Sequence, residues 1–239
     1  MKQLITRMSR VLRTRHDRVN VAAFDRNGLA RQYLVGTGLE IGALHHPLPV
    51  PAGVRVKYVD RMPEAELRRH YPELGHERFV TIDIVDNGET LAKVADTSQD
   101  FVIANHFLEH CEDPISTLRT FFRVLKPGGV IYLAIPEKTC TFDRDRPVTP
   151  LEHFWLDHHN GPEHSRWAHY QEWAELVDKK SNEAEAHARQ LLSKSYSIHF
   201  HVWDQSSWLL FLHSMQQTFG FHIEVILRLG IEIINVLRK

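Results

Sequence analysis

The chain has 239 residues, 43% of them hydrophobic and 25% charged, with a formal net charge of −1. A chain so close to neutral has no global field that attracts a polyanion, so we expect no nucleic acid among its partners. It has two cysteines and no apolar run of the ~18 residues that a membrane span needs, which favours a cytoplasmic protein without a membrane span or disulfide framework.

The first third of the chain predicts two helices and two strands. Apolar and basic residues at helical spacing predict a short amphipathic helix within residues 1–20 and a second helix over 28–35. Apolar runs at 39–41 and 54–59 predict strands, and each ends beside an acid, Glu40 in the first and Asp60 after the second. In an open α/β sheet, strands end in this way at a nucleotide-binding crevice.

The following residues alternate between strand and helix patterns. We expect a helix over 64–71, strands over 79–84 and 101–105, a helix over 115–125 and a strand over 130–135. A helix over 206–219, with Ser206 as its N-cap, and a hairpin over 221–237 would complete the sheet. This alternation predicts a mostly parallel sheet with right-handed crossovers.

Residues 137–203 break the pattern and contain eight of the 17 histidines. Their composition is largely helical, and a connection of this length is usually functional. We therefore expect a core formed by residues 1–136 and 204–239, and an inserted helical cap over 137–203 that binds the substrate.

Several motifs together resemble those of the class I S-adenosylmethionine-dependent methyltransferases. The motifs are Leu39-Glu40-Ile41-Gly42, Tyr58-Val59-Asp60, Thr81-Ile82-Asp83-Ile84, Ala104-Asn105-His106-Phe107-Leu108-Glu109-His110 and Leu125-Lys126-Pro127-Gly128-Gly129. The last two, in this order around a helix, are the most specific. The resemblance implies a Rossmann-like sheet of seven strands with a reversed last strand, and S-adenosyl-L-methionine as the cofactor.

The resemblance also implies how the methionine end of the cofactor is held. Gly42 would let the backbone approach that end, and Glu40 would orient it directly or through water. The family commonly has further glycines after the first, whereas here residues 43–51 contain three prolines. Proline excludes a regular helix at this point, so we expect an extended loop.

The adenosine would be held at the ends of the next two strands. Asp60 would accept hydrogen bonds from the ribose hydroxyls, with Arg61 beside the adenine. Asp83 would accept from the exocyclic amine of the adenine, and the backbone of Ile84 would contact the ring edge. Asn105, at the end of the fourth strand, would face the sulfonium.

The candidate catalytic residues are histidines. His106 follows Asn105 and either lines the cofactor pocket or acts as a base. His153 begins the first inserted helix, and His199 and His201 flank Phe200, so that alternation places both on one face of an extended segment. We predict that an imidazole acts as base and that no metal is bound, although this pair could bind one together with His153 or Asp157.

The leading interpretation is O-methylation of a small hydroxylated or sugar-containing acceptor, that is, a small molecule or a glycan. The insertion has five tryptophans in it or beside it. They could stack on the sugar rings of an acceptor or form a core for the helical cap, and the sequence leaves both interpretations open. Glu109 and His110 are interpreted as residues that cap the loop after the fourth strand. The alternatives are an N-methyltransferase acting on a small amine and a non-catalytic protein that binds the cofactor.

Overall fold

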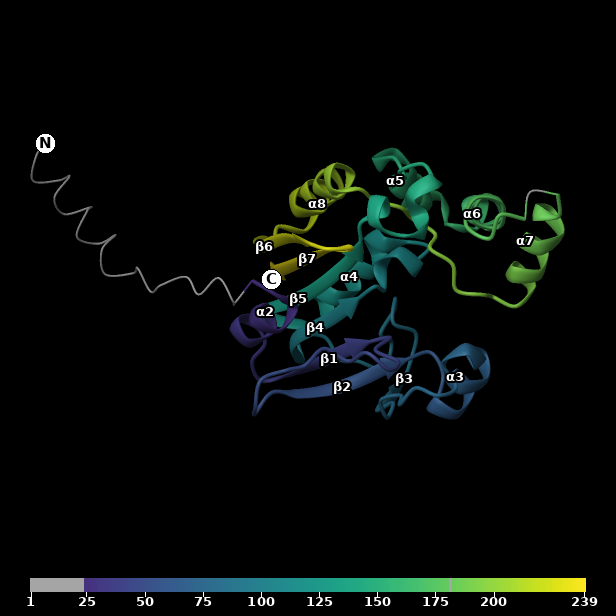
Figure 1. Cartoon of the computed structure of the whole chain (residues 1–239). Coiled ribbons are helices and arrows are strands. Elements are labelled where there is room, and N and C mark those ends of the chain that lie inside the picture. The colour runs from purple at the N-terminus through teal and green to yellow at the C-terminus, as the bar shows by residue number, and fades with distance from the viewer. Residues whose placement is uncertain (1–23, 181) are drawn as a thin grey trace, which may run out of the picture.

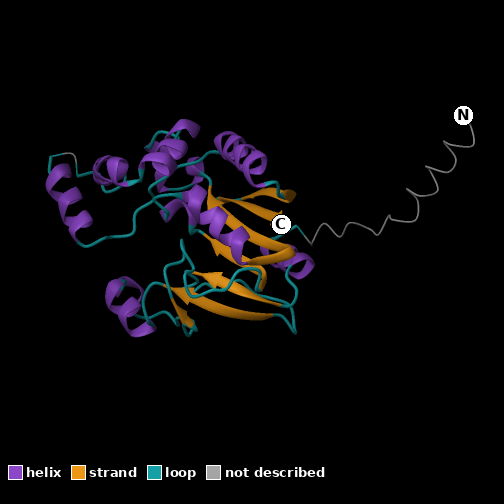
Figure 2. Ribbon diagram, turned by 180° about the vertical axis from the view of Figure 1, so that it is seen from behind, coloured by secondary structure: helices purple, strands orange, loops and turns teal. Residues whose placement is uncertain are grey.

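The computed structural model describes residues 24–180 and 182–239, which form a seven-stranded sheet with helices around it (Figures 1 and 2). The strands are β1 Thr37–Ile41, β2 Arg55–Asp60, β3 Ile84–Val85, β4 Gln99–Asn105, β5 Leu125–Pro136, β6 His222–Leu229 and β7 Glu232–Arg238. Their order is β3-β2-β1-β4-β5-β7-β6, and β7 runs antiparallel to both its neighbours. This confirms the predicted mostly parallel sheet with a reversed last strand.

The helices lie on both faces of the sheet and beyond one of its ends. They are α2 Arg26–Tyr33, α3 Glu64–His70, α4 Pro114–Val124, α5 Leu151–Asn160, α6 Glu163–Leu176, α7 Ala184–Ser193 and α8 Gln205–Phe219. The chain also forms short 3-10 turns, among them η3 Leu108–His110 and η5 Phe142–Asp145. The helix expected within residues 1–20 lies outside the described residues. Within the described part of the chain, the helices are too short or too polar to cross a membrane.

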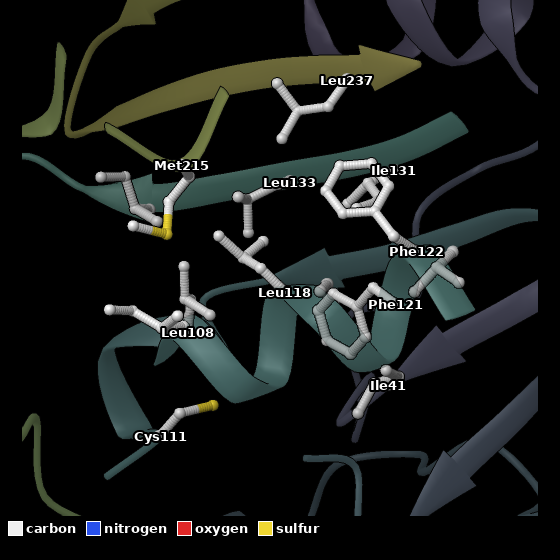
Figure 3. Close-up of a cluster of buried hydrophobic side chains, with 14 of the residues drawn as sticks. Ile41, Leu108, Cys111, Leu118, Phe121, Phe122, Ile131, Leu133, Met215 and Leu237 are labelled. Atoms are coloured by element: carbon white, nitrogen blue, oxygen red, sulfur yellow. The ribbon is translucent and has the colours of Figure 1, made fainter. Parts of the chain in front are cut away.

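Both faces of the central strands are buried. In β5, Ile131 and Leu133 pack with α4 and α8 on one face, and Tyr132 and Ala134 pack with α2 on the other. Figure 3 shows the first of these clusters, in which the side chains of α4 lie against β5 and β7. This double burial explains why the central strands appear in the sequence as continuous apolar runs.

Several predicted boundaries were wrong, and two of them depend on single side chains. The strand expected over 79–84 is reduced to Ile84–Val85. The Asp83 carboxylate accepts a hydrogen bond from the Tyr58 amide at 2.8 Å, and the Asp83 amide donates to the Tyr58 carbonyl at 3.0 Å, in place of a regular ladder. Helix α8 is capped by Asp204 rather than by Ser206, since the Asp204 carboxylate accepts a hydrogen bond from the Ser207 amide. Asp204 was missed because Ser206, two residues later, is also a good cap residue by type.

The chain between β5 and α8 forms α5, α6 and α7, which project beyond the ends of the strands (Figure 1). Part of this segment has an apolar cluster of its own, formed by α6, α7 and the residues that follow α7. The members are Tyr170, Trp173, Ala174, Ala184, Ala188, Leu191, Ile198 and Phe200.

Candidate active site

A cavity of about 350 Å³ lies where β1, β2 and β4 end. Its lining combines apolar, charged and imidazole side chains: Ile41, Gly42, Leu44, Asp60, Arg61, Tyr71, Leu74, Asn87, Gly88, Glu89, His106, Phe107, His110 and Ser197. The carboxyl ends of parallel strands are where open α/β sheets bind ligands, and the volume is in the range of small-molecule sites. Four of the predicted site residues meet here, namely Gly42, Asp60, Arg61 and His106.

The loop after β1 turns sharply at the cavity. Gly42 has a φ of +65°, in the left-handed region that glycine adopts without strain. Leu44, with a φ of +47°, is also left-handed, and it lies in the loop where the family commonly has further glycines. No helix forms between β1 and β2, in agreement with the prolines at 47, 49 and 51.

Asp60 ends β2 and presents a largely buried carboxylate, 8% exposed. Burial raises its pKa, and this is opposed by hydrogen bonds from the backbone of Arg61 and Met62 and by the Arg61 charge. The Arg61 guanidinium lies 2.8 Å from Nε2 of His70 on α3. A desolvated acceptor beside a cation suits a ligand that offers hydroxyl donors.

The loop Asn87–Glu89 forms the wall next to Asp60, and sequence reasoning missed it. Asp86 fixes this loop by accepting hydrogen bonds from the amides of Asn87 and Lys93 at 2.9 and 2.7 Å. Gly88 is required sterically, since a Cβ there would lie 2.5 Å from Cγ2 of Ile41. The signal was Asp86-Asn87-Gly88, a typical turn sequence directly after a strand.

Asp83 and Ile84 lie outside the cavity lining. Asp83 is exposed, and its carboxylate accepts a hydrogen bond from the Tyr58 amide. It lies four residues before the loop Asn87–Glu89. In that loop, burial and the nearby carboxylates of Glu112 and Asp113 raise the pKa of Glu89 to about 7.

Glu40 and Asn105 are buried or half-buried and are not among the lining residues. Oε1 of the buried Glu40 accepts a hydrogen bond from the Leu48 amide at 2.8 Å, which fixes the proline-rich loop. Burial raises the pKa of Glu40 to about 7. Both polar side-chain atoms of Asn105 are buried without a hydrogen-bond partner. Such atoms usually have a partner in the functional state, so Asn105 marks a place for a ligand or water.

His106 reaches the cavity on a left-handed turn, with φ at +51°. Its Nε2 lies 3.0 Å from the Glu232 carboxylate and its Nδ1 lies 3.4 Å from the Glu109 carboxylate. Burial lowers the pKa of His106, but these two carboxylates outweigh it and raise the pKa to about 9. Glu232 also binds Arg26 of α2 through two hydrogen bonds. His106 is thus a cation at neutral pH, which is unsuitable for a base.

Glu109, His110 and His199 form a cluster, the cavity-wall cluster, with one ligand atom of each within 4.8 Å of the others, and His110 lines the cavity. Glu109 is fully buried, and within the part of the chain that the structure describes neither carboxylate oxygen has a hydrogen-bond partner. Nδ1 of His110 lies 2.8 Å from the Ile198 carbonyl, so it carries the ring proton and leaves a lone pair on Nε2. Burial and the neighbouring His199 lower the pKa of His110 to about 4.

His199 is oriented from behind by Asp143 of η5, whose carboxylate lies 2.7 Å from Nδ1. The fully buried Arg146 donates to the same carboxylate at 2.8 Å and to Glu172 of α6 at 2.7 Å. Burial alone would raise the pKa of Asp143, but His199 and Arg146 hold it below its usual range. Asp143 and Arg146 were not predicted, because their only sequence signal is charge within a polar segment.

His153 and His201 lie in a second cluster, the cap cluster, together with Asp157 and His169. His199 and His201 therefore belong to different clusters rather than to one site. The cap cluster joins α5, α6 and the segment after α7, and its residues are absent from the cavity lining. Burial and the adjacent imidazoles lower the pKa of His169 to about 4, and burial lowers that of His201 to about 3.

The five tryptophans all belong to the described part of the chain, and none of them lines the cavity. Trp203 and Trp208 are fully buried beside the sheet, and Trp173 is in the apolar cluster of the cap. The structure thus supports a packing role for these three residues.

Comparisons with known proteins agree with this geometry. The family model described as "Methyltransferase domain" matches residues 7–183, which is more than half of the chain. The thiol S-methyltransferases TMT1B of Rattus norvegicus and Mus musculus are 37% and 36% identical over 87 residues. The match covers 34% of this chain and 34% of each relative, so the chain spans about a third of the length of these relatives.

Solved structures match this chain at low sequence identity. A Rhodobacter sphaeroides structure that bears the name Zn-dependent alcohol dehydrogenase has a TM-score of 0.52 at 14% identity, covering 90% of this chain and 89% of that one. A SAM-dependent methyltransferase from Aquifex aeolicus has a TM-score of 0.47 at 14% identity, covering 93% of each chain. With the matched domain, the strand order and the cavity at the strand ends, the chain belongs to the class I S-adenosylmethionine-dependent methyltransferases.

Proposed function

We propose that this methyltransferase acts on a hydroxyl group of a small hydroxylated or sugar-containing molecule. The observation that carries the proposal is the presence in the cavity lining of His110, whose Nδ1 is engaged by a carbonyl so that its other nitrogen keeps a lone pair. A hydroxyl must lose its proton when it is methylated, so a proton acceptor at the acceptor position favours O-methylation over transfer to an amine, whose lone pair is already free.

The residues of the cavity fit the cofactor. Asp60 would accept from the ribose hydroxyls, with Arg61 beside it, and the left-handed Gly42 would admit the methionine end. The Asn87–Glu89 loop takes over the adenine contacts that the sequence assigned to Asp83 and Ile84, and the unpartnered amide of Asn105 would face the sulfonium. Glu40 would act indirectly, by fixing the loop after β1.

S-adenosylmethionine supplies the methyl group as part of a sulfonium, and the chain aligns the acceptor and removes its proton. His110 would accept the proton at Nε2, and the buried Glu109 carboxylate would offset the positive charge that the ring gains. The Asp143–His199 pair would position His110, since the rings of His110 and His199 meet edge to face at 4.7 Å between centroids.

Tyr71 and Ser197 line the same cavity and would select the acceptor through hydrogen bonds. Ser197 begins the segment that returns from α7, so the insertion supplies part of this wall. We therefore propose that residues 137–203 act as the substrate-binding cap of a core formed by residues 1–136 and 204–239.

The acceptor class is tested with isotopically labelled cofactor and matched panels of alcohols, amines and thiols. We expect transfer to at least one hydroxylated acceptor at a higher rate than to its amine and thiol counterparts. The thiol arm is included because the curated relatives are named thiol S-methyltransferases. Preferential labelling of the amines or thiols would contradict O-methylation and leave the cofactor site untouched.

The base is tested with His110→Gln. We expect kcat to fall at least ~100-fold, within the range that general-base catalysis contributes, with little change in cofactor affinity. Because the pKa of His110 is about 4, this imidazole stays unprotonated as pH falls from neutrality toward 5. We therefore expect kcat of the wild type to show no loss over this range that is due to protonation of His110.

The matched control is His187→Gln. His187 also pairs with a carboxylate, Asp178, at 2.7 Å, but it lies on α7 and outside the cavity lining. Full kcat in His110→Gln, with the control unchanged, would remove His110 from the reaction.

A further inference from the structure

The cap cluster has the donor set of a metal centre. His153 and Asp157 are one turn apart on α5, His169 lies on α6, and His201 lies on the segment after α7. One nitrogen or oxygen atom of each lies within 4.8 Å of the others. Asp157, His169 and His201 are buried, whereas the side chain of His153 is 25% exposed.

The distances are close to those of a tetrahedral site. Nε2 of His153 lies 3.0 Å from Nε2 of His169 and 3.1 Å from Oδ2 of Asp157, and Nε2 of His201 lies 3.9 Å from the same oxygen. Ligands at the usual zinc distances are separated by ~3.3 Å along each edge of a tetrahedron.

Hydrogen bonds alone do not satisfy this cluster. Nε2 of His153 has a single proton or a single lone pair to offer, yet it lies within hydrogen-bond distance of both the nitrogen of His169 and the oxygen of Asp157. Within the described residues, Oδ2 of Asp157 and Nδ1 of His201 are buried without a hydrogen-bond partner. Buried polar atoms of this kind usually have a partner, and a cation would satisfy several lone pairs at once.

The surroundings support the ligands. Ser165 donates to Oδ1 of Asp157 at 2.8 Å, which leaves Oδ2 free to point into the cluster. Nε2 of His201 donates to the Glu112 carbonyl at 3.3 Å, so the nitrogen of this ring that keeps a lone pair for a metal is the buried Nδ1. Phe154 packs against His201 and Phe200 against His169, which excludes water from one side. Partners that orient the ligands and an apolar shell are typical of metal sites.

We propose that His153, Asp157, His169 and His201 bind one Zn²⁺ ion that holds α5, α6 and the segment after α7 together. Three imidazole nitrogens and one carboxylate oxygen are a common donor set for zinc, and four protein ligands without an open position are typical of a structural site. The partly exposed His153 gives the ion a route from solvent. This proposal departs from the expectation that no metal is bound. It does not depend on which acceptor is methylated.

The test is zinc binding by the full-length chain. Protein dialysed against a chelator is titrated with Zn²⁺ in competition with a chromophoric indicator, and with Co²⁺, whose visible absorption reports tetrahedral coordination. We expect one equivalent per chain, an intense tetrahedral Co²⁺ spectrum and a rise in Tm when Zn²⁺ is added.

Asp157→Asn and His169→Gln should each weaken zinc binding by more than the ~10–100-fold that loss of a residue orienting a ligand costs. His187→Gln, outside the cluster, should bind as the wild type does. Circular dichroism checks that each variant folds. Should both ligand variants fail to fold, the wild-type titration still decides.

Wild-type protein that binds no zinc, or a wild-type cobalt spectrum typical of octahedral coordination, would overturn the proposal. Folded ligand variants that bind zinc as tightly as the wild type would also overturn it. None of these readouts depends on methyl transfer, so failure of the proposed acceptor chemistry would be recognised separately.

Discussion

The titratable residues around the cavity have distinct roles because their partners differ. His106 is held between the carboxylates of Glu109 and Glu232, whereas His110 faces a carbonyl at Nδ1. One imidazole is therefore charged and the other neutral at the same pH. Both occur in the single motif Asn105–His110, so their roles depend on partners that lie far away in the sequence.

The raised pKa of His106 predicts a pH-dependent stability. The folded value of about 9 is above the unfolded value of 6.5, so the stabilisation is complete below pH 6.5. It is lost as pH rises through about 9, where the folded protein releases the proton. We expect the Tm of the wild type to fall more steeply between these pH values than that of His106→Gln.

The measurement is thermal unfolding of the two proteins in the same buffers. The difference between the two curves isolates His106 from other groups that titrate in this range. Parallel curves would show that the two carboxylates do not stabilise the charged ring.

At the scale of elements, the sequence predicted which helices and strands form better than it predicted where they begin and end. Helix α4 and the central strands follow from their apolar periodicity, because both are anchored in the core. β3 lies at the edge of the sheet and has two residues, so a side chain such as Asp83 can replace ladder pairing there. Beyond this short strand, the loop Asn87–Glu89 lines the cavity, whereas Asp83 and Ile84, the predicted adenine contacts, do not.

The start of α8 gives a test at the same scale. Asp204 accepts from the Ser207 amide at 2.8 Å, and its own amide donates to Oγ of Ser207 at 3.0 Å. Asp204→Ala removes the carboxylate cap and should cost ~1 kcal/mol of unfolding free energy. In a chain of this size the expected decrease in Tm is ~2–4 °C.

Ser206→Ala is the matched control, because Ser206 is the cap expected from sequence but lies inside the helix. Its effect on Tm should be much smaller. A larger decrease in Ser206→Ala than in Asp204→Ala, measured by calorimetry, would reverse the assignment of the cap.

At the scale of the whole molecule, the fold and part of the cavity lining could be predicted from the sequence. The strands that build the cavity contribute lining residues at or just after their own ends, so local patterns such as Tyr58–Asp60 were sufficient. The cavity wall and the cap cluster could not be predicted. They combine side chains from segments such as η5, α6 and residues 197–201, which only the tertiary fold brings together.

The proposed function requires that the cavity at the ends of β1, β2 and β4 is the cofactor site. The most direct measurement is calorimetric binding of S-adenosylhomocysteine to the wild type, Asp60→Asn and Asp83→Asn. Loss of one charged hydrogen-bond acceptor should weaken binding ~10–100-fold in Asp60→Asn, whereas Asp83→Asn, outside the lining, should bind nearly as the wild type does. Equal affinities for wild type and Asp60→Asn, or a larger loss in Asp83→Asn, would contradict the placement of the cofactor.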